Sequence, residues 1–202
     1  MADAAFWDRI AERYAARPVG NPDAYEATLA RVSAWLTPEA RVIELGCGTG
    51  STALRLAGAV AAYRGTDVAP GMIAIARAKD APPQLSFEVA DATGGLTGGA
   101  DVVLAFNLLH LVNDLPGLLA EVHEALPEGG LFISKTPCLG GKWWLRPVIA
   151  AMQWLGKAPS PVAFLRTDML EAALLDAGFA IEERGDYPAR PPSRFLVARK
   201  GG

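Results

Sequence analysis

The decisive stretch of this sequence reads Val42-Ile43-Glu44-Leu45-Gly46-Cys47-Gly48-Thr49-Gly50. Its apolar start predicts a short buried strand, and the residues from Ser51 onward predict a helix. Three glycines at alternate positions lie between them, where a Cβ would obstruct a tight turn or the close approach of a ligand. Because a helix N-terminus after such a turn presents backbone N–H groups, we expect a flat, polar ligand that carries a carboxylate or a phosphate.

The glycine spacing narrows the choice of ligand. A dinucleotide fingerprint reads G-x-G-x-x-G, whereas here Ser51 stands where the third glycine would be and Gly50 precedes it. Glu44 stands two residues before Gly46, where an acid would suit a cationic ligand better than a pyrophosphate. The pattern E-x-G-x-G-x-G resembles the first motif of class I S-adenosylmethionine (SAM)-dependent methyltransferases.

Length and composition set the outer bounds. A chain of 202 residues predicts one domain with a full core, and a net charge of −3 with no basic cluster argues against nucleic acid as a partner. Cys47 and Cys138 form no disulfide framework and lie in no metal-ligand spacing, so no metal site is expected. Asp3 and Asp8 argue against a signal peptide, and no apolar run reaches the roughly 18 residues of a membrane span. We expect a reduced, cytoplasmic, soluble protein, while the oligomeric state is left open.

Two helical patterns, at residues 3–16 and 22–36, precede the first strand. The resemblance implies that they cap the cofactor and help to shape the acceptor pocket. Tyr14, and after it Tyr25, are therefore candidates to reach the site. The alternative is that these aromatic residues form the packed face of an amphipathic helix.

Two further acids follow predicted strands. Asp67 lies 21 residues after Gly46, at the end of a strand over 61–67, where an acid accepts hydrogen bonds from a ribose diol. Asp91 follows a strand over 85–90, and the resemblance implies that it binds the adenine amino group while the Ala92 N–H donates to the ring. It also implies that Val68 and Met72 flank the adenine. The alternatives are that Asp67 begins a helix before Pro70 and that Asp91 caps a turn.

The apolar run at 101–106 predicts a central strand, so residues from Asn107 onward should face the cleft. We include Asn107 among the expected cofactor contacts. His110 is a candidate base, because an imidazole can accept a proton near neutral pH. Its alternative is a half-buried structural histidine that is hydrogen-bonded to the backbone.

The rest of the chain continues the resemblance. Leu126-Pro127-Glu128-Gly129-Gly130 is similar to the L-K-P-G-G motif of these methyltransferases, although Glu128 replaces a proline. A capped helix over 167–179, with a glycine stop at its end, is expected before two final strands. The implied fold is a Rossmann-like α/β domain. It has seven mostly parallel strands in the order 3-2-1-4-5-7-6, with the last strand antiparallel, helices on both faces and N-terminal capping helices. The expected organisation is capping helices at 1–38, a SAM-binding core at 40–134, an insertion at 135–165, and a C-terminal helix and hairpin at 166–202.

The insertion holds three of the five tryptophans of the chain, Trp143, Trp144 and Trp154. The resemblance implies that it lines the acceptor pocket or acts as a lid over it. One alternative is a peripheral membrane contact through residues 142–155, because tryptophan beside lysine and arginine suits the lipid–water interface. Another is additional core.

The resemblance is strongest to small bacterial methyltransferases of the ubiquinone-biosynthesis-like (type 11) group. It implies SAM as the cofactor and S-adenosylhomocysteine (SAH) as the product. Glu44 and the backbone of Gly46, Cys47, Gly48 and Gly50 would hold the methionine end. We expect methyl transfer to a small-molecule acceptor mainly by alignment, with His110 or Tyr14 acting as a base only if the acceptor must lose a proton. The alternatives are a lipid or quinone acceptor at a membrane surface, and a noncatalytic SAM-binding sensor or partner subunit.

Overall fold

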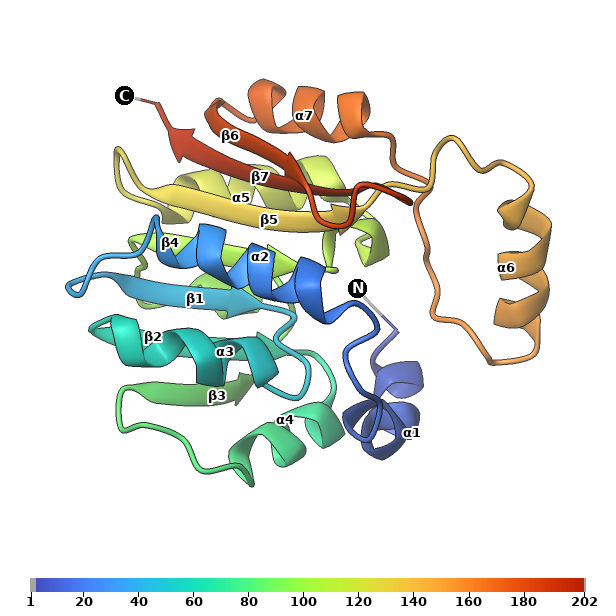
Figure 1. Cartoon of the computed structure of the whole chain (residues 1–202), viewed down its shortest axis with the longest axis horizontal. Helices are drawn as coiled ribbons and strands as arrows, with labels where there is room; N and C mark the ends of the chain where they lie inside the picture. Colours follow the sequence, from blue (N-terminus) through green and yellow to red (C-terminus); the bar gives the residue numbers. More distant parts are fainter. Residues whose placement is uncertain (1–2, 202) are drawn as a thin grey trace.

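The computed structural model describes residues 3–201 as a sheet covered by helices on both faces (Figure 1). The strands are β1 (Arg41–Leu45), β2 (Ala62–Asp67), β3 (Leu85–Val89), β4 (Val102–Phe106), β5 (Leu131–Pro137), β6 (Phe179–Asp186) and β7 (Ser193–Lys200). The α-helices are α1 (Ala4–Ala15), α2 (Pro22–Ser33), α3 (Ser51–Leu56), α4 (Pro70–Arg77), α5 (Leu115–Ala125), α6 (Leu145–Trp154) and α7 (Thr167–Asp176). Three single 3₁₀ turns complete the described elements: η1 (Ala57–Ala59), η2 (Gly94–Leu96) and η3 (Leu109–Leu111).

The sheet has the predicted topology. Its strand order is β3-β2-β1-β4-β5-β7-β6, and β7 runs antiparallel to both neighbours while the other pairings are parallel. The chain moves outward from β1 to β3 and then returns to place β4 on the other side of β1. The carboxyl ends of β1 and β4 therefore form the point where the strand order reverses, which is where open α/β sheets bind their ligands.

Successive side chains of the central strands point to opposite faces of the sheet, so the core consists of two layers. Val42 and Leu104 belong to one apolar cluster, which α2, α3 and α4 cover. Ile43 and Val103 belong to a second cluster on the opposite face, which α5 and α7 cover. Because both faces are buried, the strands read as nearly continuous apolar runs, as expected for a parallel sheet.

The N-terminal helices are fixed by specific contacts. Asp3 caps α1 by accepting a hydrogen bond from the Phe6 N–H at 3.0 Å, and α1 packs on α4, where the Asp8 carboxylate accepts from the Gly71 N–H at 2.5 Å. In α2, Arg31 pairs with Glu183 of β6 at 2.6 Å. The contacts with α4 hold α1 beside the carboxyl ends of the parallel strands, and the Arg31–Glu183 pair joins α2 to β6.

Some element boundaries differ from those predicted. Helix α2 ends at Ser33 rather than Leu36, and α3 ends at Leu56 before a 3₁₀ turn. The expectation of a capped start for α7 was wrong, because Arg166 is its N-cap and no side chain supplies a capping hydrogen bond. The predicted glycine stop after α7 is present, since Gly178 has a φ of 91°.

Residues 139–166, which we call the arm, leave the sheet after β5 and return at α7. In Figure 1 the arm and its helix α6 project beyond the edge toward which the parallel strands point. None of its residues is buried. Its base is closed by a hydrogen bond from the Gly140 N–H to the Leu165 carbonyl at 2.8 Å. Within residues 3–201, no helix is long and apolar enough to cross a membrane.

Candidate functional site

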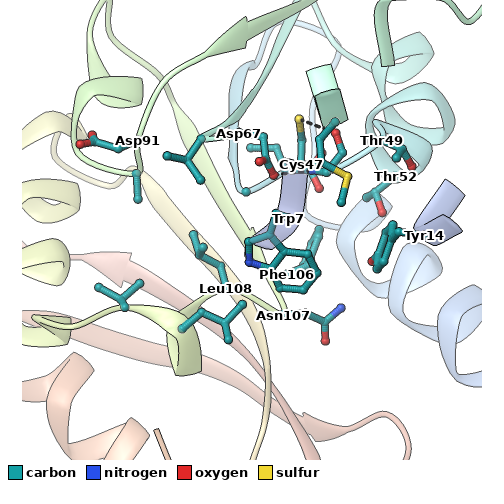
Figure 2. Close-up of a pocket in the computed structure, with 18 of the residues that line it drawn as sticks. Trp7, Tyr14, Cys47, Thr49, Thr52, Asp67, Asp91, Phe106, Asn107 and Leu108 are labelled. Carbon is teal, nitrogen blue, oxygen red and sulfur yellow. Dashed lines mark hydrogen bonds between the residues drawn. The ribbon is translucent and has the colours of Figure 1, made fainter. Parts of the chain in front are cut away.

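A cavity of about 620 Å³ lies at the carboxyl ends of the parallel strands. Its wall combines the glycine loop after β1, the ends of β2, β3 and β4, and α1 with the loop that follows it. Figure 2 shows Asp91 at one end of this space, Asp67 and Cys47 near its middle, and Tyr14 with Thr52 at the other end. The sheet topology thus brings together segments that are far apart in the sequence.

The glycine loop adopts the backbone that its composition requires. Gly46, Gly48 and Gly50 have φ values of 67°, 54° and 74°, in the left-handed region where a Cβ is unfavourable. Between them, the Cys47 N–H donates to the Thr66 carbonyl at 2.8 Å, which fixes the loop to β2. Burial raises the pKa of the Cys47 thiol, so this side chain is an unreactive part of the wall.

Asp67 connects the glycine loop to the end of β2. Its two carboxylate oxygens accept hydrogen bonds from the Gly48 N–H and the Ala69 N–H, each at 2.9 Å. Burial nevertheless raises the pKa of Asp67, because the surroundings disfavour its charge more than these donors stabilise it. A carboxylate oxygen can accept further hydrogen bonds, so a ligand with paired hydroxyl donors would stabilise the charged form.

Glu44 lies at the floor of the cavity and is only 2% exposed. The Tyr63 hydroxyl donates to its Oε2 atom at 2.8 Å. Burial raises the pKa of Glu44 to about 7, the Tyr63 hydrogen bond opposes this shift, and the charge of Asp67 adds to it. The carboxyl group is therefore close to half ionised at neutral pH, and a cationic ligand beside it would favour the ionised form.

Asp91 follows β3 and accepts at its Oδ1 atom from the Gly94 N–H at 2.7 Å and the Thr93 hydroxyl at 2.9 Å. The hydrogen bond from the Gly94 N–H, and after it the one from the Thr93 hydroxyl, lower the pKa of Asp91. Its carboxylate is therefore ionised at neutral pH and gives this end of the cavity a negative charge. The turn-capping alternative is therefore present, and Asp91 lines the cavity at the same time. Ala92, Val68 and Met72 line it too, although Met72 is 2% exposed and also packs against α1.

Helix α1 brings aromatic side chains to the cavity. Tyr14 is 44% exposed and makes an edge-to-face contact with Trp7, with ring centroids 6.0 Å apart. Burial, followed by the charge of Asp67, raises the pKa of Tyr14. Tyr25 also reaches the wall, and its hydroxyl lies 3.3 Å from the Thr52 hydroxyl. The amphipathic alternative for α1 also holds in part, because Phe6 and Ala11 are buried and Ala11 packs with Met72 and Trp7.

The end of β4 separates two predicted site residues. Asn107 has a φ of 55° and lines the cavity, while its N–H donates to the Lys135 carbonyl at 2.8 Å. His110 does not line it. Burial lowers the pKa of His110 to about 4, and its Nδ1 atom has no hydrogen-bond partner among the described residues. Only its backbone carbonyl is engaged, by the Ala163 N–H of the arm at 2.7 Å.

The predicted site residues thus fall into two groups. The structure brings eleven of them to one cavity wall: Tyr14, Glu44, Gly46, Cys47, Gly48, Asp67, Val68, Met72, Asp91, Ala92 and Asn107. It does not bring Gly50 or His110 there. A Cβ on Gly50 would lie 2.5 Å from Phe87 Cζ, so this glycine is required by packing behind the loop. No side chain of the arm lines the cavity either.

Other residues line the cavity besides the predicted site residues. Thr49 and Thr52 directly follow the glycine motif, so their proximity to it could have indicated them. Leu108 and Leu111 lie in the segment expected to face the cleft. Trp7 and Arg17 come from the N-terminal region, and no local sequence signal indicates that they reach the site.

The donor set supports a particular kind of ligand. Acidic side chains line the cavity at Glu44, Asp67, Asp91, Asp114 and Glu121, whereas Arg17 is its one basic lining residue within the described part of the chain. Apolar and aromatic side chains line the same cavity, and Figure 2 shows Trp7, Phe106 and Leu108 grouped on one side of Asp67 and Asp91. This combination fits a ligand that has a cationic centre, hydroxyl or amino donors and an aromatic ring.

Comparisons with known proteins agree with this chemistry. Residues 14–184 match the family described as a methyltransferase domain. A polyketide synthase of Burkholderia thailandensis is 35% identical over 108 residues, which are 46% of this chain and 2% of that protein. A trans-aconitate 2-methyltransferase of Deinococcus radiodurans is 36% identical over 102 residues, which are 50% of this chain and 39% of that enzyme. The aligned regions are thus less than half the length of either relative.

A solved structure shares the whole fold. The magnesium protoporphyrin IX methyltransferase of Synechocystis, solved with bound SAH, superposes with a TM-score of 0.70 and covers 98% of this chain and 93% of its own. Its sequence identity is 22%, so this likeness shows the fold alone. Together with the family match over most of the chain, it shows that this protein belongs to the methyltransferase domain family and has the class I, SAM-dependent methyltransferase fold.

Proposed function

We propose that this protein binds SAM in the cavity and transfers its methyl group to a small-molecule acceptor held beside it. One observation carries the proposal: Gly48, Asp67 and Asp91, which lie at the carboxyl ends of three different strands, line a single cavity of about 620 Å³. Family membership supports the reaction class. The cavity's mixed acidic and apolar lining supports the choice of ligand.

In the cofactor half of the cavity, each acidic residue along the sheet edge would bind a different part of SAM. Asp67, already fixed by the Gly48 and Ala69 N–H groups, would accept hydrogen bonds from the ribose hydroxyls. Asp91 would accept from the adenine amino group, with Val68 and Met72 against the ring. Glu44 and the Gly46–Gly48 backbone would hold the methionine end, where the ligand's positive charge favours the ionised carboxylate.

The acceptor half would be the region between α1 and the end of β4, where Trp7, Tyr14 and Leu108 line the wall. The bound cofactor supplies a methyl carbon on a positively charged sulfur. A lone pair of the acceptor would form the new bond to this carbon, and the electron pair of the broken carbon–sulfur bond would stay on sulfur in SAH. The protein's contribution is to hold the two reactants in line and exclude water.

The titration of the candidate bases supports catalysis by alignment. The low pKa of His110 makes its imidazole a weak base, and its side chain is outside the cavity lining. Tyr14 does line the cavity, but its raised pKa keeps the phenol neutral at neutral pH. Tyr14 would therefore orient the acceptor by hydrogen bonding rather than remove a proton from it.

The proposal is tested by calorimetry and by product release. SAM and SAH should each bind with one-to-one stoichiometry. SAH should form from SAM when a panel of candidate methyl acceptors is supplied, in which alcohols, amines, thiols, carboxylates and carbon acids are each represented. Binding of SAM without SAH release across the panel would favour the noncatalytic sensor instead. Failure to bind SAM at all would refute both functions.

A second candidate function is methyl transfer to a lipid or quinone at a membrane surface. The specific observation in its favour is the exposed apolar surface of the arm, which projects from the same edge of the molecule as the cavity. Quinol and phospholipid acceptors presented in vesicles should therefore be part of the acceptor panel. SAH release that requires vesicles would select this candidate over a small water-soluble acceptor.

A further inference from the structure

The exposed apolar side chains of this protein are concentrated in the arm. Six of the eleven large apolar side chains that are exposed in the described chain lie between residues 143 and 155. They include the three tryptophans of the arm, Trp143, Trp144 and Trp154, which are 75%, 55% and 86% exposed. Exposed tryptophans cost free energy in water, so a cluster of them on one projecting segment indicates a surface that another body covers.

The arm presents these side chains in an ordered way. Trp144, Val148, Met152 and Leu155 recur at spacings of four, four and three residues, so they share one face of α6 and its C-terminal end. One contact joins the arm to α1, and another joins two parts of the arm to each other. The Arg9 guanidinium donates to the Gly156 carbonyl at 2.9 Å, and Arg146 stacks over the Phe164 ring at 5.2 Å.

The charge of the arm differs from that of the rest of the protein. Residues 139–166 contain four basic residues and no acidic one, namely Lys142, Arg146, Lys157 and Arg166. In the remainder, all 22 acidic residues of the chain outnumber the other 15 basic ones. A negatively charged surface would therefore attract the arm and repel most of the rest of the molecule, which sets the orientation of approach.

We propose that the arm docks this protein on an anionic lipid bilayer, with its tryptophans and the apolar face of α6 at the lipid–water interface. Lys142, Arg146 and Lys157 would lie at the level of the negatively charged headgroups, while Arg166, at the base of the arm, pairs with Asp168 of α7. The inference does not depend on the proposed methyl transfer, because it concerns a surface that shares no lining residue with the cavity.

Two other occupants fit the arm less well. A second copy of this chain would bring two positively charged arms together, which mutual repulsion opposes. Closure of the arm over the cavity would require it to leave its contacts with Arg9 and with the His110 carbonyl, which accepts from the Ala163 N–H at 2.7 Å. A bilayer satisfies the apolar face and the positive charge without any rearrangement.

The test is vesicle flotation of the full chain. The protein should float with vesicles of phosphatidylglycerol and phosphatidylcholine and remain unbound with phosphatidylcholine alone. Binding should fall as salt is raised, because screening weakens the headgroup attraction. In vesicles of brominated lipid, the tryptophan fluorescence of the wild-type protein should be quenched, because the arm tryptophans would lie beside the brominated acyl chains.

Matched variants make the test specific. The triple variant Trp143→Ser/Trp144→Ser/Trp154→Ser should lose binding roughly tenfold or more, as should the charge reversal Lys142→Glu/Lys157→Glu. The control Met169→Ser/Leu175→Ser removes two side chains of similar exposure, 53% and 52%, on α7 and should bind as the wild type does. Melting temperature and SAM affinity, unchanged in every variant, establish that folding is intact.

Two kinds of result would overturn the proposal. One is a flotation result in which the wild-type protein does not float with anionic vesicles at low salt, or in which the tryptophan variant floats as well as the wild type. The other is a concentration-dependent dimer that the tryptophan substitutions abolish while vesicle binding is absent, which would assign the arm to self-association.

Discussion

At the scale of single residues, burial in and around the cavity shifts the pKa values of an acid and of a base in opposite directions. Burial disfavours charge, so it raises the pKa of the Glu44 carboxyl to about 7 and lowers the pKa of the His110 imidazole to about 4. Glu44 faces the cavity, where a ligand can change its protonation, whereas His110 does not. The first shift therefore predicts a binding effect and the second predicts a stability effect.

We expect SAM to bind more tightly as the pH rises from about 6 to about 8, and binding to release protons. Glu44 is largely protonated below its pKa of about 7, and a cationic ligand requires the carboxylate. Calorimetry in two buffers of different ionisation enthalpy measures the released protons. Glu44→Gln should abolish this part of the release, while the cavity-lining control Glu121→Gln should retain it. Equal proton release in the wild type and in Glu44→Gln would contradict the assignment.

The low pKa of His110 predicts a loss of stability in acid. The folded protein keeps this imidazole neutral down to about pH 4, whereas the unfolded chain binds a proton below about 6.5. The folded state therefore loses up to roughly 3 kcal/mol through His110 as the pH falls across that window. Chemical denaturation at several pH values should show a smaller loss in His110→Gln than in the wild type, with His123→Gln as the matched histidine control. Parallel stability curves for wild type and His110→Gln would argue against the shift.

Replacement of Asp67 by asparagine should weaken the binding of the cofactor. In Asp67→Asn the amide nitrogen cannot accept the hydrogen bond that one of the Gly48 and Ala69 N–H groups now donates. We expect SAM and SAH affinities to fall together by roughly tenfold or more. The control Asp101→Asn changes an acid that accepts from the Arg41 N–H at the opposite edge of the sheet. Unchanged affinity in Asp67→Asn, measured by calorimetry, would remove Asp67 from the ribose site.

At the scale of elements, the glycine loop serves two surfaces at once. Gly46 and Gly48 face the cavity, while Gly50 allows Phe87 of β3 and Ala76 of α4 to pack behind the loop. The Phe87 contact explains why the third glycine is needed although it does not line the cavity. The glycine motif therefore has two roles, because it lines the ligand cavity and also allows the loop after β1 to pack against β3 and α4.

Gly50→Ala should destabilise the fold. The new Cβ would lie 2.5 Å from Phe87 Cζ, and the residue would have to keep a φ of 74°. Such strain costs roughly 1–3 kcal/mol, which for a protein of this size lowers the melting temperature by about 2–12 °C. Gly58→Ala is the matched control, because no atom lies within 4 Å of the point that a Cβ on Gly58 would occupy. A thermal melt of Gly50→Ala that matches the control would refute the packing role.

At the scale of the whole molecule, the sheet and the arm are separate in energetic terms. The core clusters are built from the strands and the helices α2, α3, α4, α5 and α7, and no residue of the arm belongs to the buried set. Leu165 packs against one core cluster at the base of the arm, and the rest of the arm adds no buried side chain to the core. Removal of the projecting part should therefore affect the stability of the sheet little.

Replacement of residues 142–161 by a short glycine–serine linker should leave the core intact. The Gly140–Leu165 hydrogen bond closes the base of the arm, so the linker has only a short gap to bridge. We expect the melting temperature and SAM affinity to change little, while binding to anionic vesicles is lost. Differential scanning calorimetry and SAM titration provide the measurements. A large fall in the melting temperature would mean that the arm is part of the core.

Sequence alone determined the features that depend on local chemistry. The strand–glycine–helix stretch at 42–51, the acids at the ends of β2 and β3, and the apolar runs of the strands predicted the central strands and the glycine and acidic residues of the cavity wall, while the resemblance to class I methyltransferases supplied the strand order. These predictions succeed because backbone conformation at glycine and burial of alternate side chains are set within a few residues. They also place Asp67 and Asp91 at the same edge of the sheet.

Tertiary structure alone decided the features that depend on distant contacts. It turned the side chain of His110 out of the cavity lining, brought Trp7 and Arg17 into it, and gave Gly50 a packing partner in Phe87. It also left the tryptophans of the arm exposed, although the same residues could have packed as core. The physical reason is that exposure is set by which segments meet in space, and a residue's sequence neighbours do not specify that.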